Sequence, residues 1–197
     1  MKIIALSILL AAVAMIGCTS ASNNTANNST NRTNVNVVNA TPVTSNTVVA
    51  NSNTAAPGGD FMAEAASGGM TEVELGKIAS SKAQNAEVKK FAEMMVTDHT
   101  KAGDDLKALA VKKNITLPTT PNATHQATIK KFQSMSGAEF DKAYVDDMLE
   151  DHEKDVAEFE KQSQSNPDAD VKAFAAKTLP TLKKHLDAIK ALHAKMK

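Results

Sequence analysis

The chain has 197 residues, in which 22 Lys and Arg balance 22 Asp and Glu, and it contains one Cys and no Trp. A length of this order allows one domain. Zero formal net charge argues against a nucleic-acid partner, because binding to phosphate needs a surplus of basic residues. The single Cys excludes an intramolecular disulfide and any Cys-rich zinc or iron–sulfur site.

Residues 1–18 have the pattern of an export signal. Lys2 supplies a short basic region, and the apolar run over 3–16 is too short to span a bilayer as a mature helix. The run ends in Met-Ile-Gly-Cys at 15–18, which resembles the bacterial lipobox, where the Cys is lipidated and becomes the new N-terminus. We therefore expect a lipoprotein whose partner is the membrane, anchored through Cys18; plain secretion is the alternative.

The residues after the Cys bear on location and on the tether. Thr19 stands where an Asp would, by resemblance to enterobacterial lipoproteins, retain the protein in the inner membrane, so a periplasm-facing outer-membrane lipoprotein of the cell envelope is favoured. Residues 19–60 are rich in Asn, Thr and Ser, and Arg32 and Asp60 are their only charged residues. This composition predicts a disordered linker that tethers the domain that follows, residues 61–197.

From Phe61 onward the composition changes to Ala, Lys, Glu, Leu and Met, which favour helix. Apolar residues spaced by three and four predict four long amphipathic helices. The first covers about 60–82, the second follows Asn85, and the others begin at Ser136 and Asn166. The sequence therefore predicts an all-α fold, an elongated antiparallel four-helix bundle. Residues 122–135 are expected to add a short helix across the end of the bundle.

Local signals predict how these helices begin and bend. Ser136 and Glu139 have the spacing of a capping box, in which each side chain bonds the other residue's backbone N–H. Asn166 followed by Pro167 is typical of an N-cap and a first helical position. Pro180 lies inside the last helix and predicts a kink in the turn before it.

Four polar residues interrupt the apolar stripes, one on each long helix: Glu72, His99, His152 and His185. Each lies within about one turn of the midpoint of its helix, so an antiparallel bundle brings all four to the same level. Neutral imidazole nitrogens and one carboxylate oxygen suit a first-row transition metal, which could be Fe, Zn, Cu or Mn. A metal site of these four residues is therefore predicted. The alternative is a set of core histidines that only form hydrogen bonds.

Other side chains near this level allow further roles. Met95 and Met148 lie one turn before His99 and His152, so they could offer thioethers to Cu(I) or simply fill the core. Asp98 and Asp151 each precede a histidine by one position and could orient an imidazole through its other nitrogen or face solvent.

Three more residues complete the candidates. Glu74 is a less well placed substitute for Glu72, because two residues advance about 200° around a helix. His125 and His193 are expected at the surface, with His193 near the C-terminus of the last helix.

The helical region resembles the bacterial family called domain of unknown function 4142. The resemblance covers essentially 61–197 and rests on GMTEVELG at 69–76, FAEMMVTDH at 91–99, SGAEFDKAY at 136–144, DHE at 151–153, TLP at 178–180 and HL at 185–186. It implies a ferritin-like fold and an exported or outer-membrane protein, and it brings no assigned activity.

A comparison with the ferritin-like di-iron enzymes refines this expectation. Those enzymes carry Glu on two helices and Glu-x-x-His on the other two. Here Val96 and Leu182 occupy the positions of the two Glu residues that precede His99 and His185, and His152 replaces another Glu. A mononuclear His-rich site fits this sequence better than a carboxylate-bridged di-iron centre.

The preferred hypothesis from the sequence is an envelope-tethered lipoprotein that binds a transition metal. One alternative is a structural or stress-related interaction module without metal, for which no protein partner is indicated. Another is a metal-dependent oxidase, catalase or hydrolase, which is less favoured because nothing in the sequence indicates an open ligand position. A third is a pH sensor based on clustered histidines.

Overall fold

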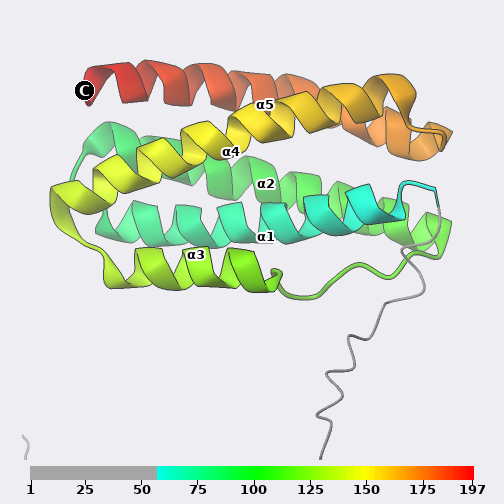
Figure 1. The fold of residues 1–197 in the computed structure, drawn as a ribbon, viewed down its shortest axis with the longest axis horizontal. Helices are drawn as coiled ribbons and strands as arrows, with labels where there is room; N and C mark the ends of the chain where they lie inside the picture. Colours follow the sequence, from blue (N-terminus) through cyan, green and yellow to red (C-terminus); the bar gives the residue numbers. More distant parts are fainter. Residues whose placement is uncertain (1–56) are drawn as a thin grey trace, which may run out of the picture. The chain divides into compact units, whose positions relative to one another are not determined.

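The computed structural model describes residues 57–197, and the regular secondary structure of this part of the chain is all α-helix. It contains five α-helices and no strand (Figure 1): α1 Gly59–Lys82, α2 Ala86–Lys113, α3 Ala123–Ser134, α4 Gly137–Ser165 and α5 Ala169–Lys195. None of these helices is both long and apolar enough to cross a membrane. The predicted signal segment with Cys18, and nearly all of the predicted linker, lie outside the described residues.

The long helices form two hairpins. α1 packs along α2, α4 packs along α5, and the hairpins meet mainly where α2 contacts α5 (Figure 1). Contacts between α1 and α4 are few. This arrangement brings all four long helices around one interior and leaves α1 and α4 loosely packed against each other.

The expectation that the short helix crosses the end of the domain is wrong, because α3 runs alongside α1 (Figure 1). Phe132 explains this position. Its ring is fully buried and lies 5.7 Å from the ring of Phe140 and 6.3 Å from that of Tyr144, both on α4. The segment that contains Pro118 and Pro121 leads the chain back from the end of α2 to this contact.

Two of the predicted helix starts differ from the structure. Asn85 caps α2 as expected, with its side chain accepting from the Glu87 N–H. Ser136 precedes α4, but its side chain makes no capping hydrogen bond, so the capping-box prediction is wrong. The next residue, Gly137, has φ of 69°, and this left-handed start differs from the extended-to-helical transition of a capping box.

The start of α5 is shifted by two residues. Asn166 ends α4, and the N-cap of α5 is Asp168, whose carboxylate accepts from the N–H groups of Asp170 and Val171. The Asn166 side chain accepts from the Asp168 N–H and so fixes the turn between the two helices. Pro180 lies inside α5, which continues through it.

One buried carboxylate fixes the α1–α2 turn to α4. Asp141 is 4% exposed and accepts hydrogen bonds from the backbone N–H groups of Gln84, at 3.0 Å, and Asn85, at 2.7 Å. These donors lie at the start of α2, where helical bonds leave N–H groups without partners. Asp141 therefore stabilises the turn and positions α1 and α2 relative to α4.

The apolar core consists of two clusters. The first includes Leu75, Met95, Met148 and Ile189, and the second includes Phe61, Leu106, Phe159 and Leu182. Along each long helix, a polar residue stands between a member of one cluster and a member of the other. These residues are Glu72, His99, His152 and His185. A polar layer thus separates the two halves of the core.

Candidate metal centre

Each long helix contributes one side chain to this polar layer. Glu72 comes from α1, His99 from α2, His152 from α4 and His185 from α5. All four are buried, with His99 the most exposed at 7%. Helical periodicity places each in the apolar stripe that its helix turns toward the interior, so the structure brings together the four residues that the sequence singled out.

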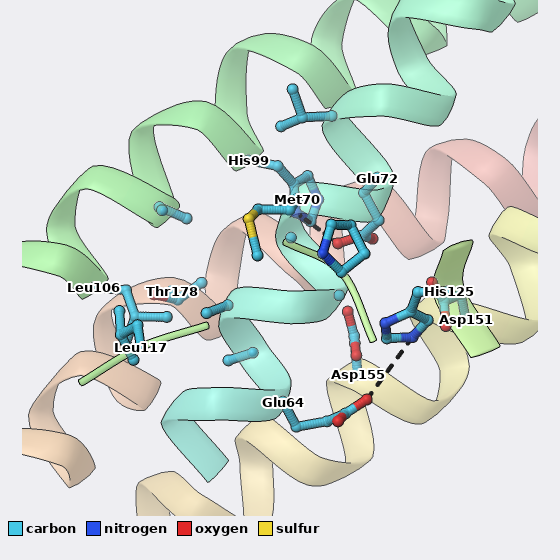
Figure 2. A pocket seen from close by; sticks show the side chains of 18 of the residues that line it. Glu64, Met70, Glu72, His99, Leu106, Leu117, His125, Asp151, Asp155 and Thr178 are labelled. Atoms are coloured by element: carbon cyan, nitrogen blue, oxygen red, sulfur yellow. Dashed lines mark ion pairs between the residues drawn. The ribbon is translucent and has the colours of Figure 1, made fainter. Parts of the chain in front are cut away.

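The three imidazoles converge on one point. His99, His152 and His185 each offer a nitrogen, and these three atoms lie within 4.8 Å of one another. His99 Nε2 and His185 Nδ1 are 3.3 Å apart. Glu72 Oε2 lies 2.8 Å from His99 Nδ1 (Figure 2), and Glu72 Oε1 lies 3.6 Å from His152 Nε2. Three nitrogens and one oxygen therefore surround a small buried volume.

A polar partner on the second ring nitrogen orients each imidazole. His152 Nδ1 donates to the Met148 carbonyl at 2.9 Å, and His185 Nε2 donates to Asp98 Oδ2 at 2.9 Å. His99 Nδ1 is paired with Glu72 Oε2. These bonds fix the tautomers of His152 and His185, because the nitrogen that donates carries the proton. The opposite nitrogens, His152 Nε2 and His185 Nδ1, are unprotonated, as metal-ligating imidazoles require; His152 Nε2 has no hydrogen-bond partner in the described part of the chain, and His185 Nδ1 lies next to His99 Nε2.

Burial sets the charge of the layer. It lowers the pKa of His152 from 6.5 to about 3, and it also lowers the pKa values of His99 and His185. All three imidazoles are therefore neutral near pH 7, the form that binds metals. Burial, together with the charge of Asp151, raises the pKa of Glu72 well above its usual value.

Three buried polar atoms in and beside the layer have no hydrogen-bond partner among the described residues: Glu72 Oε1, His152 Nε2 and the Tyr144 hydroxyl. A buried polar group without a partner costs about 1–3 kcal/mol. Two of these atoms belong to the predicted ligand set, and a cation would satisfy both. The donor set and its unpaired atoms therefore fit a metal ion.

The other predicted residues divide between core, site and surface. Asp98 contacts His185, as described above. Met95 and Met148 are fully buried in the first core cluster, and Met148 reaches the site through its carbonyl. Asp151 is half-buried at the edge of a cavity next to the site. Glu74 lies outside the layer, with a side chain that is 45% exposed and close to Lys77.

The prediction that His125 and His193 lie at the surface is wrong, because both are half-buried. The His125 side chain is 20% exposed, its Nδ1 lies 2.8 Å from Ser67 Oγ, and it lines the same cavity as Asp151. His193 Nε2 lies 3.3 Å from Asp146 Oδ1, and its side chain is 24% exposed. Both positions depend on contacts between helices, which local sequence does not show.

Sequence reasoning missed Asp155 and the polar role of Tyr144. Asp155 lines the cavity beside Glu72 (Figure 2), and burial raises its pKa well above the usual range. Asp155 follows Asp151 by four residues, and Tyr144 precedes His152 by eight, so each shares a helix face with a residue already singled out. This spacing was the available signal.

Comparison with known proteins gives one match. The family described as "Domain of unknown function (DUF4142)" matches residues 43–192. This match confirms the resemblance seen in the sequence and begins within the segment predicted to be a linker. No curated protein and no solved structure matches the chain.

Proposed function

We propose that this chain, which belongs to the DUF4142 family, binds one transition metal ion through His99, His152 and His185. One observation carries the proposal. Three neutral imidazoles from three different helices present nitrogens within 4.8 Å of one another, and the second nitrogen of each is held by a polar partner. Partners of this kind, carboxylates and a backbone carbonyl, orient metal-ligating histidines in general.

Glu72 completes the ligand set. Its Oε2 holds His99, and its Oε1 is buried, unpaired and 3.6 Å from His152 Nε2. Such a set of three neutral nitrogens and one anionic oxygen suits Zn, Fe, Cu or Mn, and a bound ion would supply Lewis acidity or, for iron, copper and manganese, redox chemistry. The ionised carboxylate would then lower the net charge of the occupied site.

The same residues form a continuous hydrogen-bond chain in the metal-free protein. A protonated Glu72 donates to His99 Nδ1, His99 Nε2 then donates to His185 Nδ1, and His185 Nε2 donates to Asp98. The raised pKa of Glu72 is consistent with this state. Binding of an ion at His99 Nε2 would require the proton on that nitrogen to leave, and the Glu72 proton would pass to His99 Nδ1. One proton is then released in all, and this coupling makes affinity rise with pH.

The fold and the location form part of the proposal. The four long helices form a ferritin-like antiparallel bundle, and a lipid on Cys18 tethers it by the segment 19–60 to the periplasmic face of the outer membrane. The helical composition after Phe61 and the lipobox-like residues at 15–18 support this arrangement. The position of His152 in place of a Glu supports a mononuclear centre.

Elemental analysis by mass spectrometry tests the metal site. The full chain is prepared without chelator, beside His99→Ala, His152→Ala and His185→Ala, with His193→Ala as the matched control. We expect near-stoichiometric metal in the wild type and in the control, and loss of metal in the other three variants, whose folding is checked by circular dichroism. Absence of metal after exposure to iron, zinc, copper and manganese, or retention of metal in the three variants, would contradict the proposal.

One observation favours a second function, a metal-dependent oxidase, catalase or hydrolase. A cavity open to solvent reaches Glu72 and His99, so a small substrate could approach the proposed ion. Consumption of peroxide or oxygen, or hydrolysis of an ester, by the metal-loaded chain and not by His152→Ala would support this activity. Metal binding without turnover would leave the binding function alone.

A further inference from the structure

A cavity of about 1120 Å³ lies between the polar layer and the ends of the helices near the Pro-containing segment. Residues of α1, α2, α4 and α5 line it, together with His125 of α3 and Leu117 of the segment between α2 and α3 (Figure 2). Cavities of this size with mainly apolar walls are typical of small-molecule sites.

The apolar wall of the cavity is part of the second core cluster. Its aromatic and aliphatic side chains are Phe61, Leu106, Leu117, Phe159, Phe174 and Leu182. Figure 2 shows Leu106 and Leu117 together at one end, away from the acidic residues. Apolar surface left uncovered in this way gains stability when a hydrocarbon group fills the space.

The other end of the cavity is acidic. Glu64, Glu72, Asp151 and Asp155 all line it (Figure 2). Within residues 57–197, neither Asp151 nor Asp155 forms a hydrogen bond or an ion pair. Burial raises the pKa of Asp155, and the nearby charges of Glu72, Asp151 and Glu64 raise it further. Among the described residues, Asp151 and Asp155 therefore have no ion-pair partner, while Glu64 is paired with His125.

The lysines around the cavity do not supply such a partner, because each is paired elsewhere. Lys107 binds Asp104, Lys154 binds Glu150, and Lys77 lies near Glu74. Their side chains are at least 60% exposed. Within the described range, Asp151 and Asp155 thus have no lysine as an ion-pair partner, whereas Glu64 lies 3.7 Å from His125 Nε2 and Glu72 lies 2.8 Å from His99 Nδ1.

Glu72 gives an independent indication of a ligand. Its side chain is 2% exposed, it lines the cavity, and its Oε1 has no hydrogen-bond partner among the residues that the structure describes. An unpaired carboxylate oxygen at the inner end of a mainly apolar cavity is suited to accept a hydrogen bond from a bound molecule.

We propose that the cavity binds an amphipathic amine, with its hydrocarbon part against Leu106, Leu117 and the neighbouring rings and its ammonium group among Glu72, Asp155 and Glu64. The ammonium group donates to oxygens of Asp155 and Glu72 that have no other hydrogen-bond donor in residues 57–197, and the hydrocarbon chain covers the apolar wall. An anionic ligand of the same length has no ammonium group to donate hydrogen bonds, and its head group would lie among four acidic side chains. The assignment does not depend on a bound metal ion.

Calorimetric titration of the full chain, in the presence of a chelator, tests the proposal. The probes are octylamine, 1-octanol and octanoate, which share a chain length and differ in the charge of the head group. We expect octylamine to bind at least about tenfold more tightly than octanol, as one charge-assisted interaction predicts, and octanoate to bind more weakly than both. Equal binding of amine and alcohol, tighter binding of octanoate, or no binding of any probe would overturn the proposal.

Two variants separate the charged and apolar contributions. Asp155→Asn should weaken octylamine binding about tenfold and leave octanol binding unchanged, and Asp187→Asn, an exposed acid on α5 away from the cavity, is the matched control. Gly69→Leu should abolish binding of octylamine and octanol, because it places a side chain in the cavity lining. A Cβ at Gly69 meets no atom within 4 Å, so this variant should fold.

These variants also distinguish amine binding from metal binding, although the two proposed sites share Glu72. Asp155→Asn and Gly69→Leu retain all three histidines, so metal content by elemental analysis should stay at the wild-type level. Loss of metal with amine binding intact, as expected for His152→Ala, would show that amine binding does not need the metal, even though both proposals use Glu72. Unchanged amine binding in Asp155→Asn and in Gly69→Leu would place the amine outside this cavity and contradict the proposal.

Discussion

His185 Nε2 and Asp98 Oδ2 lie 2.9 Å apart and join α5 to α2 across the contact between the two hairpins. The His185 side chain is completely buried, whereas that of Asp98 is 28% exposed. The carboxylate therefore reaches the imidazole from the edge of the core. It holds the ring so that Nδ1 faces His99.

This pair leads to a prediction for metal affinity. Asp98→Asn keeps a hydrogen-bond acceptor and removes the charge that makes the imidazole a stronger ligand, so metal affinity should fall by about 10- to 100-fold. Competition with a chromogenic chelator measures the change. Asp187→Asn should leave affinity unchanged, and an unaltered affinity in Asp98→Asn would show that Asp98 does not assist metal binding.

The carboxylate of Asp141 should contribute strongly to stability. Asp141→Ala removes the acceptor for the N–H groups of Gln84 and Asn85, so the free energy of unfolding should fall by about 2 to 4 kcal/mol. Asp141→Asn retains one acceptor oxygen and should lose less. Urea unfolding followed by circular dichroism gives both values, and equal losses would indicate that the charge, not the hydrogen bonds, is what matters.

Two glycines of α1 should respond to Ala in opposite directions. A Cβ at Gly76 would lie 2.9 Å from a Val96 methyl and 3.0 Å from the Ala92 carbonyl oxygen, so Gly76→Ala forces α1 and α2 apart. We expect a loss of about 1 to 3 kcal/mol. Gly68 has open space, so Gly68→Ala should gain up to about 1 kcal/mol from helix propensity. Chemical denaturation measures both, and a stable Gly76→Ala would contradict the close packing.

The metal-free protein should lose stability in acid because of His152. Its pKa falls from 6.5 to about 3 on folding, so the unfolded chain takes up this proton first as the pH decreases. Stability is therefore lost between pH 6.5 and 3, by up to about 1.4 kcal/mol per pH unit. Glu72 acts in the opposite sense, because its raised pKa lets the folded chain keep a proton that the unfolded chain loses above pH 4.5.

Comparison of the wild type with His152→Leu isolates the histidine contribution. Urea unfolding with a chelator at a series of pH values should show a shallower acid dependence in the variant, because Glu72 is present in both proteins. Parallel curves would mean that the His152 imidazole titrates alike in the folded and unfolded chains.

The polar layer was predictable from sequence because helical periodicity is local. His99, His152 and His185 replace apolar residues at regular positions, and helix midpoints place them at one level. The start of α5 was less certain, because Asn166 and Asp168 are both good caps and the hydrogen bonds of the turn decide between them. Local signals thus identify the helices better than their ends.

The cavity and the place of α3 could not be predicted in this way. Phe132 holds α3 beside α1 through contacts with rings on α4. The sequence alone does not show that these helices are neighbours. Asp155 and His125 became candidates because they line the cavity, and α1 and α4 make few contacts with each other. The sequence of one helix does not show how closely it packs against another. Such features follow from how the hairpins meet.

The division of the polar layer between the two hairpins has a mechanical consequence. Glu72 and His99 belong to the α1–α2 hairpin, and His152 and His185 belong to the α4–α5 hairpin. An ion held by all four would act as a cross-link, and the hairpins could separate only after giving up two ligands. A bound ion would then slow the separation of the hairpins and so lengthen the lifetime of the folded domain under proteolysis or tension. The packing within each hairpin would stay the same.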